Sequence, residues 1–382
     1  MKTNDYLEFY KRNSISPVHM TEHPIGKHIL NRRNLYRQLG IPMQCFRDKD
    51  VLEFGPGGGM NSLVLLLEEV GNIRHIDLVE ANSTGQKEIL ELFKNNNIAS
   101  EKFDLYKMML EDYFSDKKYD FVIAEQFLPH IPNHDEALMK IMEFVNKDGV
   151  LIITAVDETG LYVEMMKRAV AQFFARDIDD YDTKVIKLCE LYGSSLKVMK
   201  NMTRPVKDWI EDQMLNPAIL LDNPLNIKDA IEITKKDFDL LGCSQNIFVD
   251  LSWYKDSNYN LAESYKKQYD LKIQNFLLAG DDEESLVDKD INDNLEKYVR
   301  LANRLAAKME RSADWSEIGL LISYIEKVSK YTNKKQIHVF NAQLTSIMIT
   351  INEGKVIDLN KYPEFLNTFG KSSQFVSFQR KA

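Results

Sequence analysis

Residues 51–62 read Val51-Leu52-Glu53-Phe54-Gly55-Pro56-Gly57-Gly58-Gly59-Met60-Asn61-Ser62, and this stretch decides the fold. Its apolar, β-prone start runs into a glycine-rich turn, and the apolar run that follows, residues 63–67, can form a helix. Glycines let the backbone turn sharply and let a ligand approach where side chains would block it. The pattern predicts the strand–turn–helix opening of a nucleotide-binding α/β unit.

A second acidic strand end follows at the expected distance. Residues 76–80 form a short apolar run that ends in Glu80, twenty-one residues after Gly59. In Rossmann-type folds an acid at this place accepts hydrogen bonds from the ribose hydroxyls of a nucleotide. A dinucleotide-binding motif would also require a glycine at position 60, where this chain has Met60. The acid-x-Gly-x-Gly-x-Gly pattern that starts at Glu53 instead resembles the first motif of class I S-adenosylmethionine (SAM)-dependent methyltransferases.

The resemblance continues in chain order over residues 48–156. Residues 118–125 look like the family's fourth strand, and residues 127–132 are similar to its hydrophobic-Leu-Glu-His-Ile-Pro turn, with Pro129 where Glu is usual. Residues 137–154 look like the next helix, its Asp-Gly turn and the fifth strand. The resemblance implies a doubly wound, mostly parallel, seven-stranded Rossmann-like α/β sheet. It also implies SAM as the cofactor and S-adenosylhomocysteine as the product.

The resemblance further implies which residues bind the cofactor. Glu53 would orient the glycine loop and bind water near the methionine amino group, while Glu80 would bind the ribose. Met109 stands where the family usually has an acid for the adenine amine, so Glu111, Asp112 or only backbone groups would meet that amine. The full cofactor-binding set is Glu53, Gly55, Pro56, Gly57, Gly59, Asn61, Glu80, Ala81, Met109, Leu110, Glu125 and Gln126.

Catalytic groups are expected after the fourth strand, where the family places substrate-facing side chains. Glu125 is predicted to contact the acceptor or the methionine end of the cofactor. His130 has an ordinary pKa near 6.5 and can take a proton from a hydroxyl. The alternative for His130 is a capping or packing histidine in a turn.

An N-terminal cap, residues 1–47, precedes the first strand. Its helical spacing over residues 29–39 resembles the segment that covers the cofactor in many small-molecule methyltransferases. Tyr10, His19, His28 or Arg32 would then face the junction of cofactor and acceptor. Alternatively, these side chains only dock the helix on the sheet.

The rest of the chain is predicted to surround this core, residues 48–157. Residues 158–235 are expected to form a helical insertion that serves as a substrate lid. Residues 236–280 should supply the last two strands, at 247–254 and 269–278, because the first of these alternates apolar and polar side chains. Residues 281–382 are predicted to be an extension of helices and a small hairpin, with strands at 336–340, 345–351 and 356–359 and a turn at 352–355. This extension would be a covering element or a homodimer contact.

Composition narrows the class of partner. A net charge of −9 argues against a nucleic-acid substrate, because phosphate binding relies on basic surfaces. No apolar run reaches the ~20 residues of a membrane span. The three cysteines are widely spaced, the N-terminus has no apolar leader and no metal-ligand spacing is present. These features predict a cytoplasmic protein without a metal.

The predicted function is SAM-dependent methyl transfer to a small molecule or a sugar, at a hydroxyl oxygen. The opening of the chain also looks like bacterial methyltransferases of surface-polysaccharide biosynthesis. Two alternatives are a non-catalytic methyltransferase-fold scaffold or binding protein, and an aminopropyltransferase-like enzyme. The intact glycine loop argues against the scaffold, and missing acidic substrate signatures argue against the aminopropyltransferase.

Overall fold

The computed structural model describes residues 5–13, 25–198, 205–219, 223–256, 259–281 and 283–382. The chain divides into two compact units. Unit 1 comprises residues 1–155, 223–266 and 373–382, and unit 2 comprises residues 156–222 and 267–372. The chain therefore enters unit 1 three times, and its last residues return to the unit that its first residues began.

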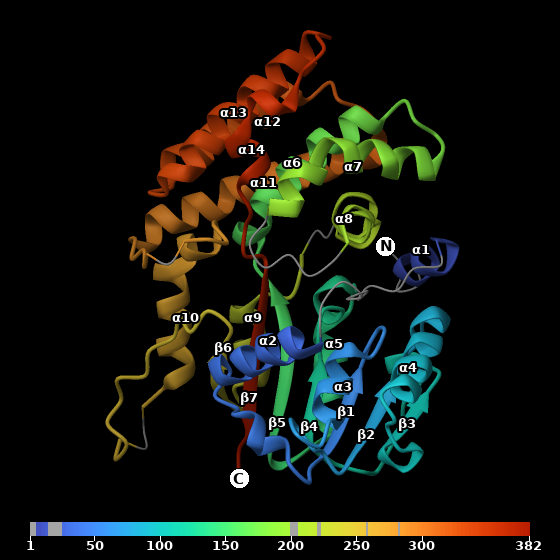
Figure 1. Ribbon diagram of the computed structural model, residues 1–382. Helices are drawn as coiled ribbons and strands as arrows, with labels where there is room; N and C mark the ends of the chain where they lie inside the picture. Colours follow the sequence, from blue (N-terminus) through green and yellow to red (C-terminus); the bar gives the residue numbers. More distant parts are fainter. Residues whose placement is uncertain (1–4, 14–24, 199–204, 220–222, 257–258, 282) are drawn as a thin grey trace. The chain divides into compact units, whose positions relative to one another are not determined.

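Unit 1 is built on a seven-stranded sheet, which confirms the predicted fold class. The strand order is β3-β2-β1-β4-β5-β7-β6 (Figure 1). β1 pairs in parallel with β2 and β4, β2 with β3, and β4 with β5, whereas β6 and β7 are antiparallel. The strands are β1 (Asp50–Phe54), β2 (His75–Val79), β3 (Phe103–Tyr106), β4 (Tyr119–Ala124), β5 (Val145–Val156), β6 (Phe238–Cys243) and β7 (Ser373–Arg380).

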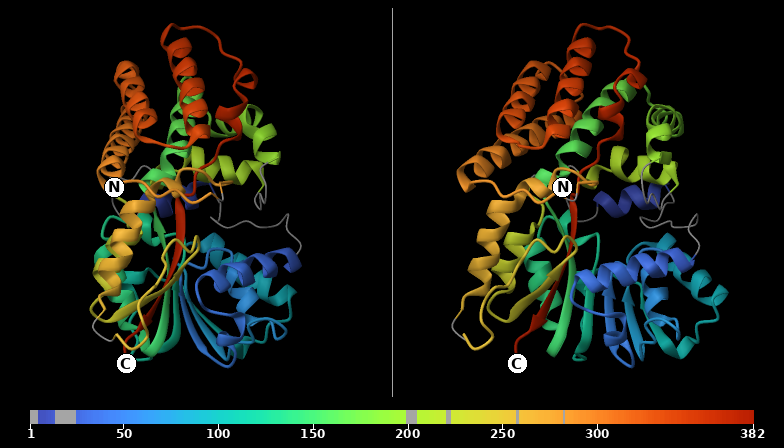
Figure 2. Two further views of the ribbon diagram at one scale, coloured as in Figure 1. Left: turned by 90° about the vertical axis from the view of Figure 1, so that its left-hand side faces the viewer. Right: turned by 60° about the vertical axis from the view of Figure 1, so that its left-hand side comes forward.

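Helices cover both faces of the sheet (Figure 2). On one face, α2, α3 and α4 bury apolar side chains such as Tyr36, Leu63 and Phe93 against Val51 and Ile123 of the strands. On the other face, the rings of Phe54 and Phe144 lie 5.8 Å apart, which packs the end of β1 beneath α5. The helices of unit 1 are α1 (Asp5–Asn13), α2 (Ile25–Gln38), α3 (Met60–Leu66), α4 (Ser83–Asn95), α5 (His134–Glu143) and α9 (Ile227–Thr234).

Unit 2 is helical and has its own core. Tyr162 donates a hydrogen bond to Asn341 at 2.8 Å, and buried Arg168 pairs with Glu310 at 2.6 Å. These contacts join α6 to the last long helices across more than a hundred residues of chain. The helices are α6 (Glu158–Ala175), α7 (Tyr181–Val198), α8 (Val206–Trp209), α11 (Lys289–Ser312), α12 (Ile318–Tyr331), α13 (Lys335–Asn352) and α14 (Pro363–Asn367), while α10 (Leu261–Lys272) crosses from unit 1 into unit 2.

The structure corrects the predicted end of the sheet. Residues 247–254 are not a strand: the sixth strand is β6, just before them. Residues 269–278 are not the seventh strand either, since they lie in α10 and a 3-10 helix at Ile273–Phe276. The seventh strand is β7, at the end of the chain. Alternation alone was misleading because a strand also needs a neighbour to pair with.

The predicted hairpin is also wrong, because residues 336–351 lie in helix α13 and residues 356–358 form neither helix nor strand. The β-branched residues in this stretch favour strands locally, but Ile337, Phe340 and Leu344 recur at helical spacing and are all fully buried. Tertiary burial therefore overrides local propensity here. The expected split at residue 280 does not match the two units either. Within the described part of the chain, no helix has the length and apolar character needed to cross a membrane.

Candidate functional site

The carboxyl ends of three neighbouring strands meet at one edge of the sheet. Phe54 is in register with Val79 of β2 and with Ala124 of β4. The next residue of each strand therefore begins a loop at the same level: Gly55, Glu80 and Glu125. Ligands of such parallel sheets bind at this edge. The structure brings these three predicted site residues together.

The glycine loop has the backbone conformation that its sequence implies. Gly55, Gly57 and Gly59 have φ angles of 66°, 58° and 79°, in the left-handed region that other residues avoid. Gly59 is also the N-cap residue of α3. The alternate glycines of the motif are thus the residues that need to be glycine, and the amide groups of this turn can approach a ligand closely.

Glu80 fastens the glycine loop to the second strand. One carboxylate oxygen of Glu80 accepts a hydrogen bond from the amide of Gly57 at 2.9 Å, and the other accepts one from the amide of Asn82 at 2.7 Å. Burial raises the pKa of Glu80 to about 7, against the opposing effect of these backbone hydrogen bonds. Gly85 permits this arrangement, because a Cβ there would lie 2.7 Å from the Gly57 carbonyl oxygen. The need for glycine at Gly85 was not predicted.

Glu53 lies beneath the loop and is bonded to the next helix. The Ser62 hydroxyl donates to Glu53 at 2.5 Å, and burial raises the pKa of Glu53 to about 7. This contact ties the end of β1 to the first turn of α3. The role of Glu53 in orienting the loop stays a prediction. Ser62 was missed because a serine in the first turn of a helix carries no sequence signal of its own.

Arg32 of α2 forms a buried ion pair with Glu125. The guanidinium donates to both carboxylate oxygens, at 2.9 and 2.6 Å, and the two side chains are only 6% and 4% exposed. Arg32 also donates to the Tyr36 hydroxyl at 2.6 Å, and Asn61 donates to Glu125 at 3.1 Å. Burial lowers the pKa of Arg32, but the charges and hydrogen bonds of Glu125 and Tyr36 together outweigh it, so the net shift is upward.

Two polar atoms of this cluster remain available to a ligand. Asn61 Oδ1 and Arg32 Nε are both buried and have no hydrogen-bond partner among the residues that the structure describes. Unsatisfied buried polar atoms are costly, and native proteins retain them mainly where a ligand or water completes them. The pair offers one acceptor and one donor within the same cluster. This chemistry fits a group that carries both an ammonium and a carboxylate.

The residues after Glu125 are held in a strained turn. Gln126 has a φ angle of 67°, which is uncommon for a residue with a side chain, and its amide donates to the Thr154 hydroxyl at 3.1 Å. The ring of Phe127 then lies against the glycine loop, 2.8 Å from where a Cβ of Gly55 would stand. Strain of this kind concentrates at functional sites. Gln126 therefore belongs to the same edge of the sheet, as predicted.

The other predicted residues surround this edge or lie further along the loops. Ala81 is half-buried and follows Glu80, and Met109 is half-buried just before the 3-10 helix Leu110–Asp112. Pro56 and Leu110 are buried. His130 is half-buried at the end of the 3-10 helix Leu128–His130. Of the N-terminal candidates, Tyr10 and His28 are buried, and His19 lies outside the described residues.

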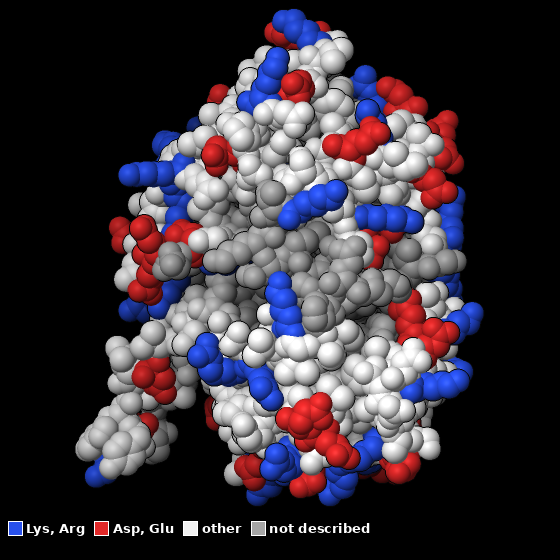
Figure 3. All heavy atoms as spheres, viewed as in Figure 1, with Lys and Arg blue, Asp and Glu red and all other residues white. Residues whose placement is uncertain are grey.

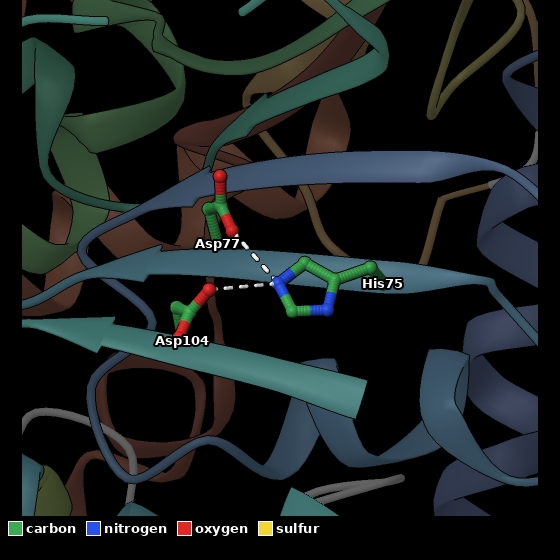
Figure 4. Close-up of side chains that lie close together, drawn as sticks. All are labelled: His75, Asp77 and Asp104. Atoms are coloured by element: carbon green, nitrogen blue, oxygen red, sulfur yellow. Dashed lines mark hydrogen bonds and ion pairs between the residues drawn. The ribbon is translucent and has the colours of Figure 1, made fainter. Parts of the chain in front are cut away.

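A separate cluster of possible metal ligands lies on strands β2 and β3. His75 Nε2 is 3.0 Å from Asp77 and 3.2 Å from Asp104, which face each other across β2 and β3 (Figure 4). The sequence spacing gave no hint of it, because one ligand comes from another strand. Lys117 Nζ is 3.2 Å from the second Asp77 oxygen. The lysine already supplies a positive charge, and this favours an ion-pair network over a metal site.

Comparison with known proteins finds similarity over the part of the chain that contains this edge. Residues 28–187 match the family "Methyltransferase domain". A ubiquinone biosynthesis O-methyltransferase of Rickettsia bellii is 26% identical over 191 residues, which is 49% of this chain and 76% of that protein. The corresponding protein of Rickettsia akari is 25% identical over 150 residues, and the chain spans about half of its length, 55%.

A solved structure of PKMT2 from Rickettsia typhi in complex with AdoHcy is also similar. It has 15% sequence identity and a TM-score of 0.41, over 65% of this chain and 50% of that chain.

Proposed function

We propose that the protein is a class I SAM-dependent methyltransferase that methylates a hydroxyl oxygen of a small-molecule acceptor, because residues 28–187 match the family "Methyltransferase domain". SAM brings an activated methyl group on its sulfonium, so the protein has mainly to bind, orient and exclude water. The observation that carries the proposal is the assembly at one sheet edge. The glycine loop, Glu80 and the Arg32–Glu125 pair meet there.

The residues of this edge fit the cofactor. Glu80 is bonded to the glycine loop and still has carboxylate lone pairs for ribose hydroxyls. Asn61 Oδ1 offers an acceptor to the ammonium of the methionine end, and Arg32 Nε offers a donor to its carboxylate. The half-buried Met109 can pack on the adenine ring, since its thioether is polarisable.

We assign the base to His130 and not to Glu125. Both oxygens of Glu125 already accept hydrogen bonds, from Arg32 and Asn61, so this carboxylate serves as a fixed negative charge. His130 follows it in the adjoining turn and can take the proton of a hydroxyl acceptor. Methylation at oxygen is also supported by the names of the two Rickettsia relatives. A sugar hydroxyl is the second candidate acceptor.

The experiment is a methyl-transfer assay with radiolabelled SAM and two acceptor classes, a panel of small non-sugar hydroxyl compounds and a reducing sugar. We expect labelled product from the non-sugar acceptors. We expect His130→Ala to lower the turnover about a hundredfold or more without weakening binding of S-adenosylhomocysteine, because general-base catalysis contributes that much. His134→Ala is the matched control, since His134 is a buried histidine bonded to the Ile131 carbonyl.

Three outcomes would contradict the proposal in different ways. No binding of SAM or S-adenosylhomocysteine in a calorimetric titration would favour a scaffold. If only the sugar is methylated, the acceptor is a sugar hydroxyl and the first candidate acceptor is wrong. Full turnover in folded His130→Ala protein would remove the base assignment and leave the methyltransferase reaction standing.

A further inference from the structure

The segment between β6 and α10 exposes large apolar side chains. Residues 244–256, here called the finger, extend away from the sheet of unit 1 (Figure 1). Four side chains of the finger are 48% to 87% exposed: Val249 48%, Leu251 87%, Trp253 64% and Tyr254 84%. In the space-filling view the finger projects at the lower left, with few charged side chains (Figure 3). Contiguous exposed apolar side chains mark interaction sites.

The base of the finger is firmly held by unit 1. Ile247 is buried, and the Phe248 ring packs against Tyr265 with 5.3 Å between centroids. The Ser244 amide donates to the Phe375 carbonyl of β7 at 2.9 Å, and the Phe375 amide donates back to the Ser244 hydroxyl at 3.1 Å. The exposed side chains are therefore carried on an anchored base, and the chain does not fold them back onto the sheet.

The end of the finger is a tight turn made from unusual residues. The Asp256 amide donates to the Trp253 carbonyl at 2.7 Å, which places Tyr254 and Lys255 at the corners of the turn. Turns favour glycine, proline, asparagine or aspartate at their corners. Turn formation therefore does not explain an aromatic pair here. Lys255 Nζ lies 5.2 and 5.5 Å from the centroids of the two rings, so its charge stays beside them.

We propose that the finger docks on a lipid surface. Trp and Tyr prefer the membrane–water interface because their rings are apolar at one end and polar at the other. A narrow turn that carries them with Leu251 can enter the headgroup region, whereas a protein partner of ordinary interface size would need a broader surface. The finger contains Asp250, Asp256 and Lys255, hence a net charge of −1. The lipid surface that suits it is therefore a neutral one, held by apolar contact.

The test is sedimentation of the full chain with phosphatidylcholine vesicles, with and without 0.5 M salt. We expect the wild type to bind at both salt concentrations. The triple variant Leu251→Ser, Trp253→Ser, Tyr254→Ser should bind at least about tenfold more weakly, because it loses the apolar area that the lipid would bury. Brominated lipid should quench the fluorescence of wild-type Trp253, since Trp209 and Trp315 are less exposed.

A matched triple variant removes exposed apolar side chains of unit 2 instead: Ile186→Ser, Leu320→Ser and Ile349→Ser, which are 61%, 42% and 46% exposed. It should bind vesicles as the wild type does. Both variants are first checked for wild-type thermal unfolding and binding of S-adenosylhomocysteine. The proposal is overturned if the wild type does not bind neutral vesicles, or binds only anionic vesicles and only at low salt. It is also overturned if the finger variant instead abolishes a dimer seen by ultracentrifugation.

Discussion

At the scale of single residues, the carboxylates of Glu53 and Glu80 are buried beside the glycine loop, where ionisation is costly. Burial raises the pKa of Glu53 and of Glu80 to about 7, from an ordinary 4.5. Each is therefore easier to ionise in the unfolded chain than in the folded one. The ligand-free protein should lose this part of its stability as the pH rises from about 4.5 through about 7. Without a ligand, the folded protein favours the protonated carboxylates. A cationic ligand with hydroxyl donors favours the ionised carboxylates instead.

We therefore expect SAM to bind more tightly at higher pH. Between about pH 6 and about pH 8 the affinity should rise about tenfold, since Glu80 changes from mostly protonated to mostly ionised. Glu80→Gln should flatten this dependence, and Glu80→Ala should weaken binding at about pH 8 by about 1–3 kcal/mol. Titration calorimetry measures both. Unchanged affinity in folded Glu80→Ala protein would show that this carboxylate does not hold the ribose.

At the scale of elements, one ion pair connects helix α2 to the end of strand β4. Arg32 and Tyr36 lie one helical turn apart on the buried side of α2, and both belong to the cluster around Glu125. The neighbouring Arg33 is exposed. The N-terminal helix is thus attached to the candidate site through a charged contact, and only one arginine of the adjacent pair contributes.

Breaking this pair from one side should be more harmful than removing it altogether. Arg32→Met leaves Glu125 buried without its cation and should cost about 3–5 kcal/mol of unfolding free energy. The double variant Arg32→Met, Glu125→Gln should recover a large part of that loss. Arg33→Met is the control and should stay within about 0.5 kcal/mol. Urea unfolding measures the wild type, these three variants and the single variant Glu125→Gln, and additive effects of the two substitutions would show that they do not interact.

At the scale of the whole molecule, the sheet is completed by the last residues of the chain. β7 lies between β5 and β6, although more than two hundred residues separate it from β5. Val376 and Phe378 are buried in this strand, and Arg380 donates to the Val145 carbonyl at 2.7 Å. Unit 1 therefore depends on a segment that follows all of unit 2 in the chain. A homodimer contact through residues 281–382 stays a prediction.

Phe378→Ala should accordingly destabilise unit 1 by about 3–5 kcal/mol, because it leaves a cavity in the middle of the sheet. Gln379→Ala, at an exposed position of the same strand, should change stability by less than about 0.5 kcal/mol. Thermal unfolding with and without S-adenosylhomocysteine measures the effect, since the ligand should report on unit 1. If the two substitutions were equally mild, β7 would not be part of the stable sheet.

The sequence alone determined what depends on local backbone chemistry and short spacing. Alternate glycines after an acidic strand end predict the loop, because only glycine takes the left-handed turns found at Gly55, Gly57 and Gly59. The spacing to Glu80 likewise predicts the second strand and its acid. For the same reason the first, second, fourth and fifth strands and the sheet edge were predictable from residues 48–156, whereas the cofactor class was implied by the resemblance of these motifs to a known family.

Only the tertiary structure decided what depends on partners distant in the chain. Residues 247–254 alternate like a strand but pair with no strand among the residues that the structure describes. In contrast, β7 lies between β5 and β6, which are distant from it in the chain. The His75 cluster and the Arg32–Glu125 pair likewise join residues from different elements. Burial and strand pairing are properties of the folded chain, so no local pattern specifies which arginine is buried or which strand closes the sheet.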